Sequence, residues 1–121
     1  MTGPLQRLGQ SGERLAADYL TAHGHEVIAA NVRRREGEID LITIDGDTLV
    51  FVEVKLRRSR ATGEAVEALT AAKQRRMAAL AEAYAADHPE LPQRQRIDLV
   101  AIDIANDGTP RITHVPNAVE G

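Results

Sequence analysis

The 121-residue sequence contains no cysteine, which excludes disulfides, zinc–thiolate sites and thiol nucleophiles. Aromatic residues are nearly absent: Tyr19, Phe51 and Tyr84 are too few for the stacking platform with which single-strand-binding domains hold bases. No apolar run approaches the length of a membrane span, and nothing near the first residue is typical of a signal peptide. We therefore expect a cytoplasmic protein without a membrane partner.

Lysine is also scarce, because Lys55 and Lys73 are the only two among 15 basic residues and the other 13 are arginines. The formal net charge of −3 argues mildly against a nucleic-acid binder. The arginines nevertheless occur in short clusters, and their planar guanidinium groups match phosphate geometry. Any one cluster is equally well explained as solvated surface charge. If nucleic acid is bound, contacts to its backbone and shape are favoured over base reading.

The length is sufficient for one domain with one modest core, spanning residues 1–121, and we expect residues 1–9 to form a loose arm. Apolar periodicity predicts a helix that ends near residue 23. A second helix could be capped by Thr62 or Thr70; we favour Thr70, with the end near Asp87 before His88-Pro89. Strands are predicted over 25–32, 37–44, 50–56, 97–104 and 111–115. This α-β-β-β-α-β order with an extra edge strand predicts an α/β fold with a mixed sheet between two helices.

The second and third strands form a predicted hairpin, because Asp45-Gly46-Asp47 is typical of a tight turn. Depending on the loop, Asp40 lies directly opposite Glu53 or diagonal to it, on the same face in either case. Like charges at such a spacing destabilise a sheet. Either Lys55 or a bound divalent cation could offset the repulsion, and hard oxygen ligands suit Mg²⁺ or Mn²⁺.

Asp40 followed by Glu53-Val54-Lys55 resembles the Asp…Glu-x-Lys signature of the PD-(D/E)XK nuclease superfamily. The wider pattern resembles the YraN-like bacterial family, which is similar to archaeal Holliday-junction resolvases. The matching segments are Gly12-Glu13, Asn31, residues 37–42, residues 50–57, Lys73-Gln74 and Asp98, within a resemblance that covers about residues 9–118. The resemblance implies a restriction-endonuclease-like αβββαβ core. It also implies a metal-dependent endonuclease that hydrolyses DNA phosphodiester bonds, with branched or structured DNA as substrate.

The same resemblance assigns roles to residues around the hairpin. Asp40, Glu53 and the Val54 carbonyl would hold Mg²⁺ or Mn²⁺, and Lys55 would orient the attacking water or neutralise the phosphorus centre. Glu13 would add a second metal or an ordered-water contact, although a glutamate in a first helical turn is also explained by the helix dipole. The residues expected to contact DNA are Arg33, Arg34, Arg35, Arg57, Arg58, Lys73 and Gln74.

Several of these residues have simpler interpretations. Lys73 falls on the apolar stripe of the second helix, so it either snorkels or reaches the scissile phosphate or Glu53. Asp98 is expected to form a strand-end salt bridge with an arginine such as Arg96. His23 and His25 are expected at the surface near a helix end, without a metal role.

Two other functions are compatible with the sequence. A nucleic-acid-binding module could retain the nuclease fold without turnover. An interaction domain could use Asp40, Glu53 and Lys55 as a structural ion network. Resolvase relatives are dimers, so a homodimer fits the resemblance, although no exposed apolar stripe requires one.

Overall fold

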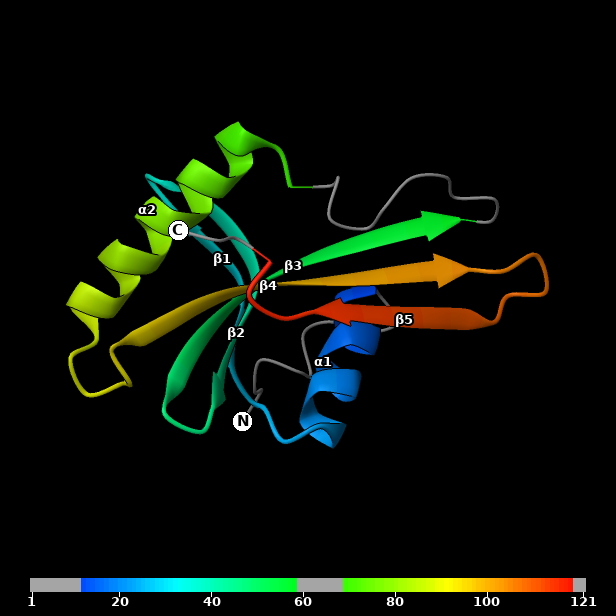
Figure 1. Cartoon of the computed structure of the whole chain (residues 1–121), viewed down its shortest axis with the longest axis horizontal. Coiled ribbons are helices and arrows are strands. Elements are labelled where there is room, and N and C mark those ends of the chain that lie inside the picture. The colour runs from blue at the N-terminus through cyan, green and yellow to red at the C-terminus, as the bar shows by residue number, and fades with distance from the viewer. Residues whose placement is uncertain (1–11, 59–68, 119–121) are drawn as a thin grey trace.

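The computed structural model describes residues 12–58 and 69–118, without the side chain of Arg58. A five-stranded sheet carries one helix on each face (Figure 1). The elements are α1 (Gly12–Ala22), β1 (Glu26–Arg34), β2 (Gly37–Asp45), β3 (Thr48–Arg58), α2 (Ala71–Asp87), β4 (Arg94–Ile104) and β5 (Pro110–Val115). The predicted αβββαβ order with an additional strand is confirmed. The predicted arm at residues 1–9 lies outside the described residues.

The sheet is mixed, as the sequence predicts, with its strands in the order β1-β2-β3-β4-β5. The pairs β1–β2, β2–β3 and β4–β5 are antiparallel, whereas β3 and β4 are parallel. A parallel pair needs a crossover connection, and α2 lies in that connection. Consequently α2 packs on β2 and β4, on either side of the central strand β3, where it can cover the hairpin residues.

Strand alternation divides the core between the two helices. Phe51 faces α2 and packs with Met77 and Leu80. Its neighbours Val50 and Val52 face the other way, into the cluster under α1. All these side chains are fully or almost fully buried. The even and odd positions of β3 therefore point to different helices, as expected from the sequence.

The helix ends follow local signals. The Thr70 hydroxyl accepts a hydrogen bond from the Lys73 N–H, and α2 ends at Asp87, so Thr70 is the cap as predicted. Gly24 has φ +94°, a conformation that suits glycine directly after α1. Within the described residues, neither helix is long and apolar enough to cross a membrane.

The strands extend further than their apolar patterns. β3 runs to Arg58 and β4 begins at Arg94, so both include charged residues beyond the predicted limits. The parallel ladder from Thr48↔Arg94 to Arg58↔Ile104 explains the difference. Backbone hydrogen bonds between strands do not require apolar side chains, so the partner strand decides where pairing stops.

Candidate active site

The β2–β3 hairpin sets the register of the two predicted acids. Asp45 pairs with Thr48 across a two-residue turn, and the ladder continues to Leu41↔Val52. The next step in that register places Asp40 opposite Glu53, one of the arrangements that the sequence predicts. Main-chain pairing ends there, and the Asp40 carboxylate instead accepts a hydrogen bond from the Val54 N–H at 2.7 Å. The Asp40 side chain is thus fixed against β3 where the two strands separate.

Glu53 is buried on the face of β3 that α2 covers, with 6% of its surface exposed. Its Oε2 accepts a hydrogen bond from the Lys73 ammonium, and the two residues form an ion pair. Lys73 lies one helical turn before Met77, so a charged residue on the apolar stripe is explained by the acid beneath it. Of the predicted interpretations of Lys73, contact with Glu53 is confirmed.

Glu13, in the first turn of α1, acts on Asp40 from the other helix. A Cβ at Gly12 would touch the Leu56 side chain at 3.5 Å, so the start of α1 packs directly on β3. This contact brings Glu13 close enough to influence Asp40. Burial raises the pKa of Asp40 to about 6, and repulsion from Glu53 and Glu13 adds to the rise. The Val54 hydrogen bond and Lys73 oppose the rise without cancelling it.

A hollow of ≈ 380 Å³ opens over Asp40, Glu53 and Lys73, between β2, β3 and α2, and Glu13 is not among its lining residues. It is lined by Gly37, Glu38, Asp40, Glu53, Lys73, Arg76 and Met77. Gly37 has φ +151°, which disfavours a side chain, and a Cβ there would lie 3.6 Å from Arg76 Cβ. Arg76 was not assigned a role from the sequence, although its position three residues after Lys73 places it on the same side of the helix. The hollow therefore brings two cationic side chains, Lys73 and Arg76, to the same opening as the acids.

Lys55 is exposed and does not line this hollow. Strand alternation places it on the Glu53 side of β3, but within residues 12–58 and 69–118 it forms no ion pair. Lys73, not Lys55, is the cation that contacts Glu53. The predicted role of Lys55 in orienting water stays a prediction.

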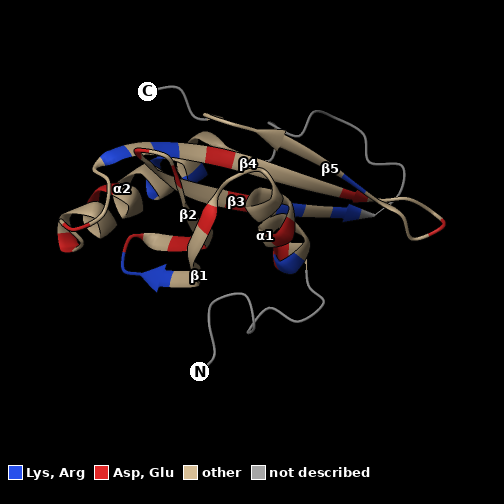
Figure 2. Cartoon of the chain, turned by 90° about the horizontal axis from the view of Figure 1, so that it is seen from below, with Lys and Arg blue, Asp and Glu red and all other residues tan. Residues whose placement is uncertain are grey.

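The predicted DNA-binding residues differ in how strongly they are bonded to other residues of the protein. Lys and Arg gather at the end of β1, along α2 and toward the end of β3 (Figure 2). Arg33 is 80% exposed and lies 3.8 Å from Glu38, and Arg35 is also exposed. Arg57 donates two hydrogen bonds to Asp103, at 2.8 and 3.2 Å.

Two further residues that are predicted to contact DNA are bonded to other residues of the protein. Arg34 pairs with Asp87 at the end of α2. The Gln74 side chain donates a hydrogen bond to the Leu69 carbonyl at 2.8 Å. Among Arg33, Arg34 and Arg35, the side chains of Arg33 and Arg35 are therefore the most accessible to a ligand.

A second polar cluster lies elsewhere in the fold. Arg96 donates to both oxygens of Asp98, at 2.9 and 3.1 Å, so the predicted Asp98 salt bridge is confirmed. The prediction that His25 lies at the surface is wrong, because only 4% of its side chain is exposed. Its metal-ligating atoms and those of Asp98 and His114 lie within 4.8 Å of one another. No local pattern of residues predicts this grouping, since its members come from three distant strands or strand ends.

Comparison with known proteins identifies the family. Residues 12–102 match the sequence model of the uncharacterised protein family UPF0102. A UPF0102 protein of Symbiobacterium thermophilum is 51% identical over 113 residues, covering 93% of this chain and 96% of the relative. The chain belongs to the UPF0102 family. The predicted YraN-like family is confirmed at this level.

Other UPF0102 relatives match at similar length. The protein of Rhodococcus jostii is 49% identical over 111 residues, covering 92% of this chain and 94% of the relative. The protein of Roseiflexus castenholzii is 46% identical over 123 residues, covering 99% of this chain and 98% of the relative. These relatives carry the UPF0102 name without an activity, so a function has to be argued from the acidic hollow itself.

Proposed function

We propose that this UPF0102 protein is a divalent-metal-dependent endonuclease that hydrolyses phosphodiester bonds in branched or otherwise structured DNA. The observation that supports the proposal best is the convergence of Asp40, Glu53 and Glu13 opposite one lysine. The Asp…Glu-x-Lys motif, which resembles that of PD-(D/E)XK nucleases, supports the same class of reaction.

The donor set fits Mg²⁺ or Mn²⁺. Asp40 and Glu53 supply hard carboxylate oxygens, and Mg²⁺ needs only one or two of these in addition to water. Burial, with repulsion from Glu53 and Glu13, raises the pKa of Asp40, so a bound cation would favour its charged form. Asp40, Glu53 and the Val54 carbonyl would hold the cation, and Glu13 would hold a second cation or an ordered water. A bound divalent cation polarises a phosphoryl oxygen and lowers the pKa of a coordinated water.

The remaining groups of the chain have complementary tasks in this proposal. The Lys73 ammonium balances Glu53, and Arg76 beside it offers a guanidinium to a non-bridging phosphate oxygen. Lys55 orients the attacking water. Arg33 and Arg35 hold flanking phosphates, and Arg34 and Arg58 extend that contact.

Three proposed DNA contacts need existing bonds to be exchanged. Arg34 would leave Asp87 and Arg57 would leave Asp103 to reach a phosphate. The Gln74 side chain would leave the Leu69 carbonyl. These residues are therefore expected to matter less for binding than Arg33 and Arg35.

A cleavage assay tests the activity. Labelled four-way junction, flap and linear duplex DNA are incubated with the protein and Mg²⁺ or Mn²⁺. We expect metal-dependent cleavage that falls at least about 100-fold in Asp40→Asn and in Glu53→Gln. Asp47→Asn is the matched control, because Asp47 is an exposed acid in the turn of the same hairpin and should leave the rate unchanged. Absence of cleavage of all three substrates would reject the proposal, as would full activity in both acid variants.

A nucleic-acid-binding module without turnover is the second candidate. The observation that favours it is that Lys55 lies away from the hollow, while Lys73 already neutralises Glu53. This candidate predicts salt-dependent binding to DNA without a product. Binding should be lost when Arg33, Arg34 and Arg35 are all changed to Ala. Gel-shift titrations at several salt concentrations distinguish it, and affinity that is indifferent to salt would count against it.

A further inference from the structure

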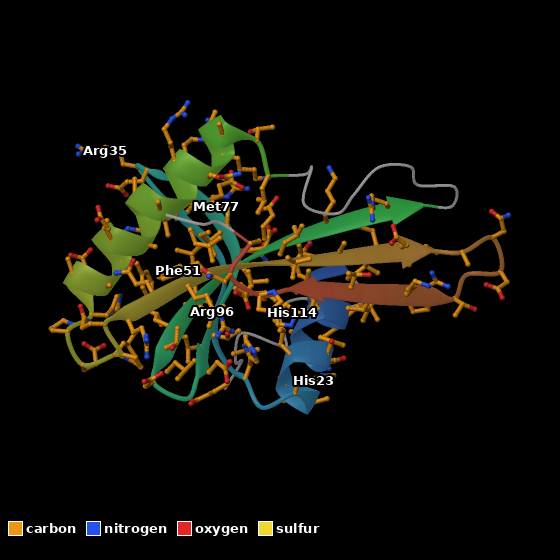
Figure 3. The ribbon with its side chains drawn as sticks, in the orientation of Figure 1. His23, Arg35, Phe51, Met77, Arg96 and His114 are labelled. Atoms are coloured by element: carbon orange, nitrogen blue, oxygen red, sulfur yellow. The ribbon has the colours of Figure 1, made fainter. Side chains whose placement is uncertain are left out.

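Three metal-ligating side chains meet on the side of the sheet that faces α1, away from the acidic hollow. His25 directly precedes β1, Asp98 lies in β4 and His114 lies in β5. The rings of His25 and His114 have centroids 5.8 Å apart, and Tyr19 of α1 contacts the His114 ring edge-on. Figure 3 labels Arg96 and His114, which lie near the middle of the molecule between the two helices. Residues from the two edges of the sheet are thus brought together.

Within residues 12–58 and 69–118, one ring nitrogen of His25 is within hydrogen-bond distance of a partner and the other is not. Nδ1 lies 2.8 Å from Thr43 Oγ1, within hydrogen-bond distance. The acid oxygen nearest to Nε2 in the described chain is Asp45 Oδ2, at 3.6 Å, which is too long for a hydrogen bond. If Nδ1–H donates to Thr43, Nε2 carries a free lone pair. Metal-binding histidines are commonly held in this way by a hydrogen bond at the other ring nitrogen.

The unpartnered nitrogen faces a group with excess negative charge. Arg96 Nη2 lies 3.1 Å from Asp45 Oδ2 and also 3.1 Å from Asp98 Oδ2. One guanidinium therefore bridges two carboxylates, and Asp98 is completely buried. A lone pair beside two acids and one fixed cation is an environment that favours an added positive ion.

His114 and Asp98 offer the other two ligands. His114 Nε2 donates to Asp98 Oδ2 at 2.8 Å, so a single proton bridges these atoms. Two ligands about 2.0–2.1 Å from a tetrahedral zinc lie roughly 3.3 Å apart, so only a small opening is needed. Two imidazoles and one carboxylate are donors that zinc accepts, and softer metals would require thiolates that this chain lacks.

We infer that His25, Asp98 and His114 form a zinc site that is separate from the acidic hollow and ties the start of β1 to β4 and β5. Zinc replaces the proton between His114 Nε2 and Asp98 Oδ2, and that proton is released to solvent. The His25 Nε2 lone pair and one oxygen of Asp98 complete three protein ligands, with water in the fourth position. Arg96 keeps its bonds to the other oxygen of Asp98 and to Asp45.

Zinc binding to the metal-free full chain tests the inference. Calorimetry is performed with Zn²⁺ in an Asp40→Asn, Glu53→Gln background, so that the acidic hollow does not contribute. We expect one equivalent to bind and the melting temperature to rise. Adding His25→Gln should weaken binding at least about 30-fold, whereas His23→Gln, which changes an exposed histidine two residues away, should not change it. Co²⁺ in place of Zn²⁺ should give the visible absorption of a tetrahedral nitrogen–oxygen site.

His25→Gln is the decisive variant because His25 makes no hydrogen bond to Asp98. Asp98 therefore keeps its hydrogen bonds from Arg96, His114 and the Asn117 N–H. Circular dichroism should confirm that this variant folds. Zinc binding equal in the His25→Gln and His23→Gln proteins would overturn the inference, and so would the absence of zinc binding to the background protein. Because the acidic hollow is disabled in every sample, neither outcome depends on whether the protein is a nuclease.

Discussion

Asp40 and Asp98 are both largely buried carboxylates of the same sheet, but their surroundings shift their pKa values in opposite directions. Burial raises the pKa of Asp40 to about 6, helped by Glu53 and Glu13. Burial acts on Asp98 in the same sense, but hydrogen bonds from His114, Arg96 and the Asn117 N–H hold its pKa below the usual value. The difference therefore lies in the partners that the chain supplies.

The comparison indicates what each region lacks. Around Asp98 the carboxylate is satisfied by the chain, whereas Nε2 of the neighbouring His25 has no hydrogen-bond partner among the described residues. Around Asp40 the acids outnumber the cations, so the region is stabilised by anything positive that enters. A satisfied buried acid contributes to folding, whereas an incompletely balanced one is a place for a ligand. Four variants or conditions test this contrast.

The largest effect is expected at Asp98. Asp98→Asn removes the fully buried charge that accepts hydrogen bonds from Arg96, His114 and the Asn117 N–H, so the free energy of unfolding should fall by about 3–5 kcal/mol. Urea denaturation at pH 7 measures it. Asp103→Asn is the control: Asp103 is a partly exposed acid that pairs with Arg57, so its loss should cost about 1 kcal/mol. Equal losses in the two variants would contradict the special position of Asp98.

The second effect concerns an added divalent cation. Mn²⁺ at 100 times its dissociation constant should stabilise the wild-type fold by about 2.7 kcal/mol, because it binds the native state alone. Glu53→Gln should abolish this gain, and Asp47→Asn should keep it. Thermal melts with and without Mn²⁺ provide the measurement. An unchanged melting temperature in the wild type would favour an interaction domain in which the Glu53–Lys73 pair is purely structural.

A third effect is the pH dependence of Asp40 without metal. The folded chain keeps the Asp40 proton up to about pH 6, whereas the unfolded chain loses it near 3.8, so stability falls as the pH rises between these values. Asp40→Asn should therefore stabilise the protein by about 1–2 kcal/mol at pH 8 and hardly at all at pH 3.5. Denaturation in EDTA at both pH values measures whether Asp40→Asn raises or lowers the free energy of unfolding. A variant less stable than wild type at pH 8 would show that Asp40 is already balanced.

The smallest effect is expected at the cap of α2. Thr70→Ala removes the hydroxyl that accepts from the Lys73 N–H and should lower stability by about 1 kcal/mol. Thr70→Ser keeps the hydroxyl and should lose much less. Comparing the Mn²⁺ stabilisation of both variants shows whether the first turn of α2 also positions Lys73. Identical free energies of unfolding for Thr70→Ala and Thr70→Ser would mean that the hydroxyl cap does not stabilise α2.

Much of the fold could be predicted because it depends on neighbouring residues. The turn at Asp45-Gly46-Asp47 and the alternation along β3 set the hairpin register, so Asp40 and Glu53 were placed together from the sequence. Thr70 and Pro89 fixed the limits of α2 for similarly local reasons. The ends of β3 and β4 were not predictable, since each depends on where the other strand stops pairing.

The sequence by itself determined the hairpin, the helix caps and the faces of the strands, because turn chemistry and side-chain periodicity act over a few residues. Only the tertiary structure decided that Lys73 contacts Glu53, that Glu13 influences Asp40 and that His25 is buried beside Asp98 and His114. These contacts join segments far apart in the chain, and their distances depend on how α1, α2 and the two edges of the sheet pack. Electrostatic energies depend on those distances and on burial, and the local pattern of residues determines neither quantity.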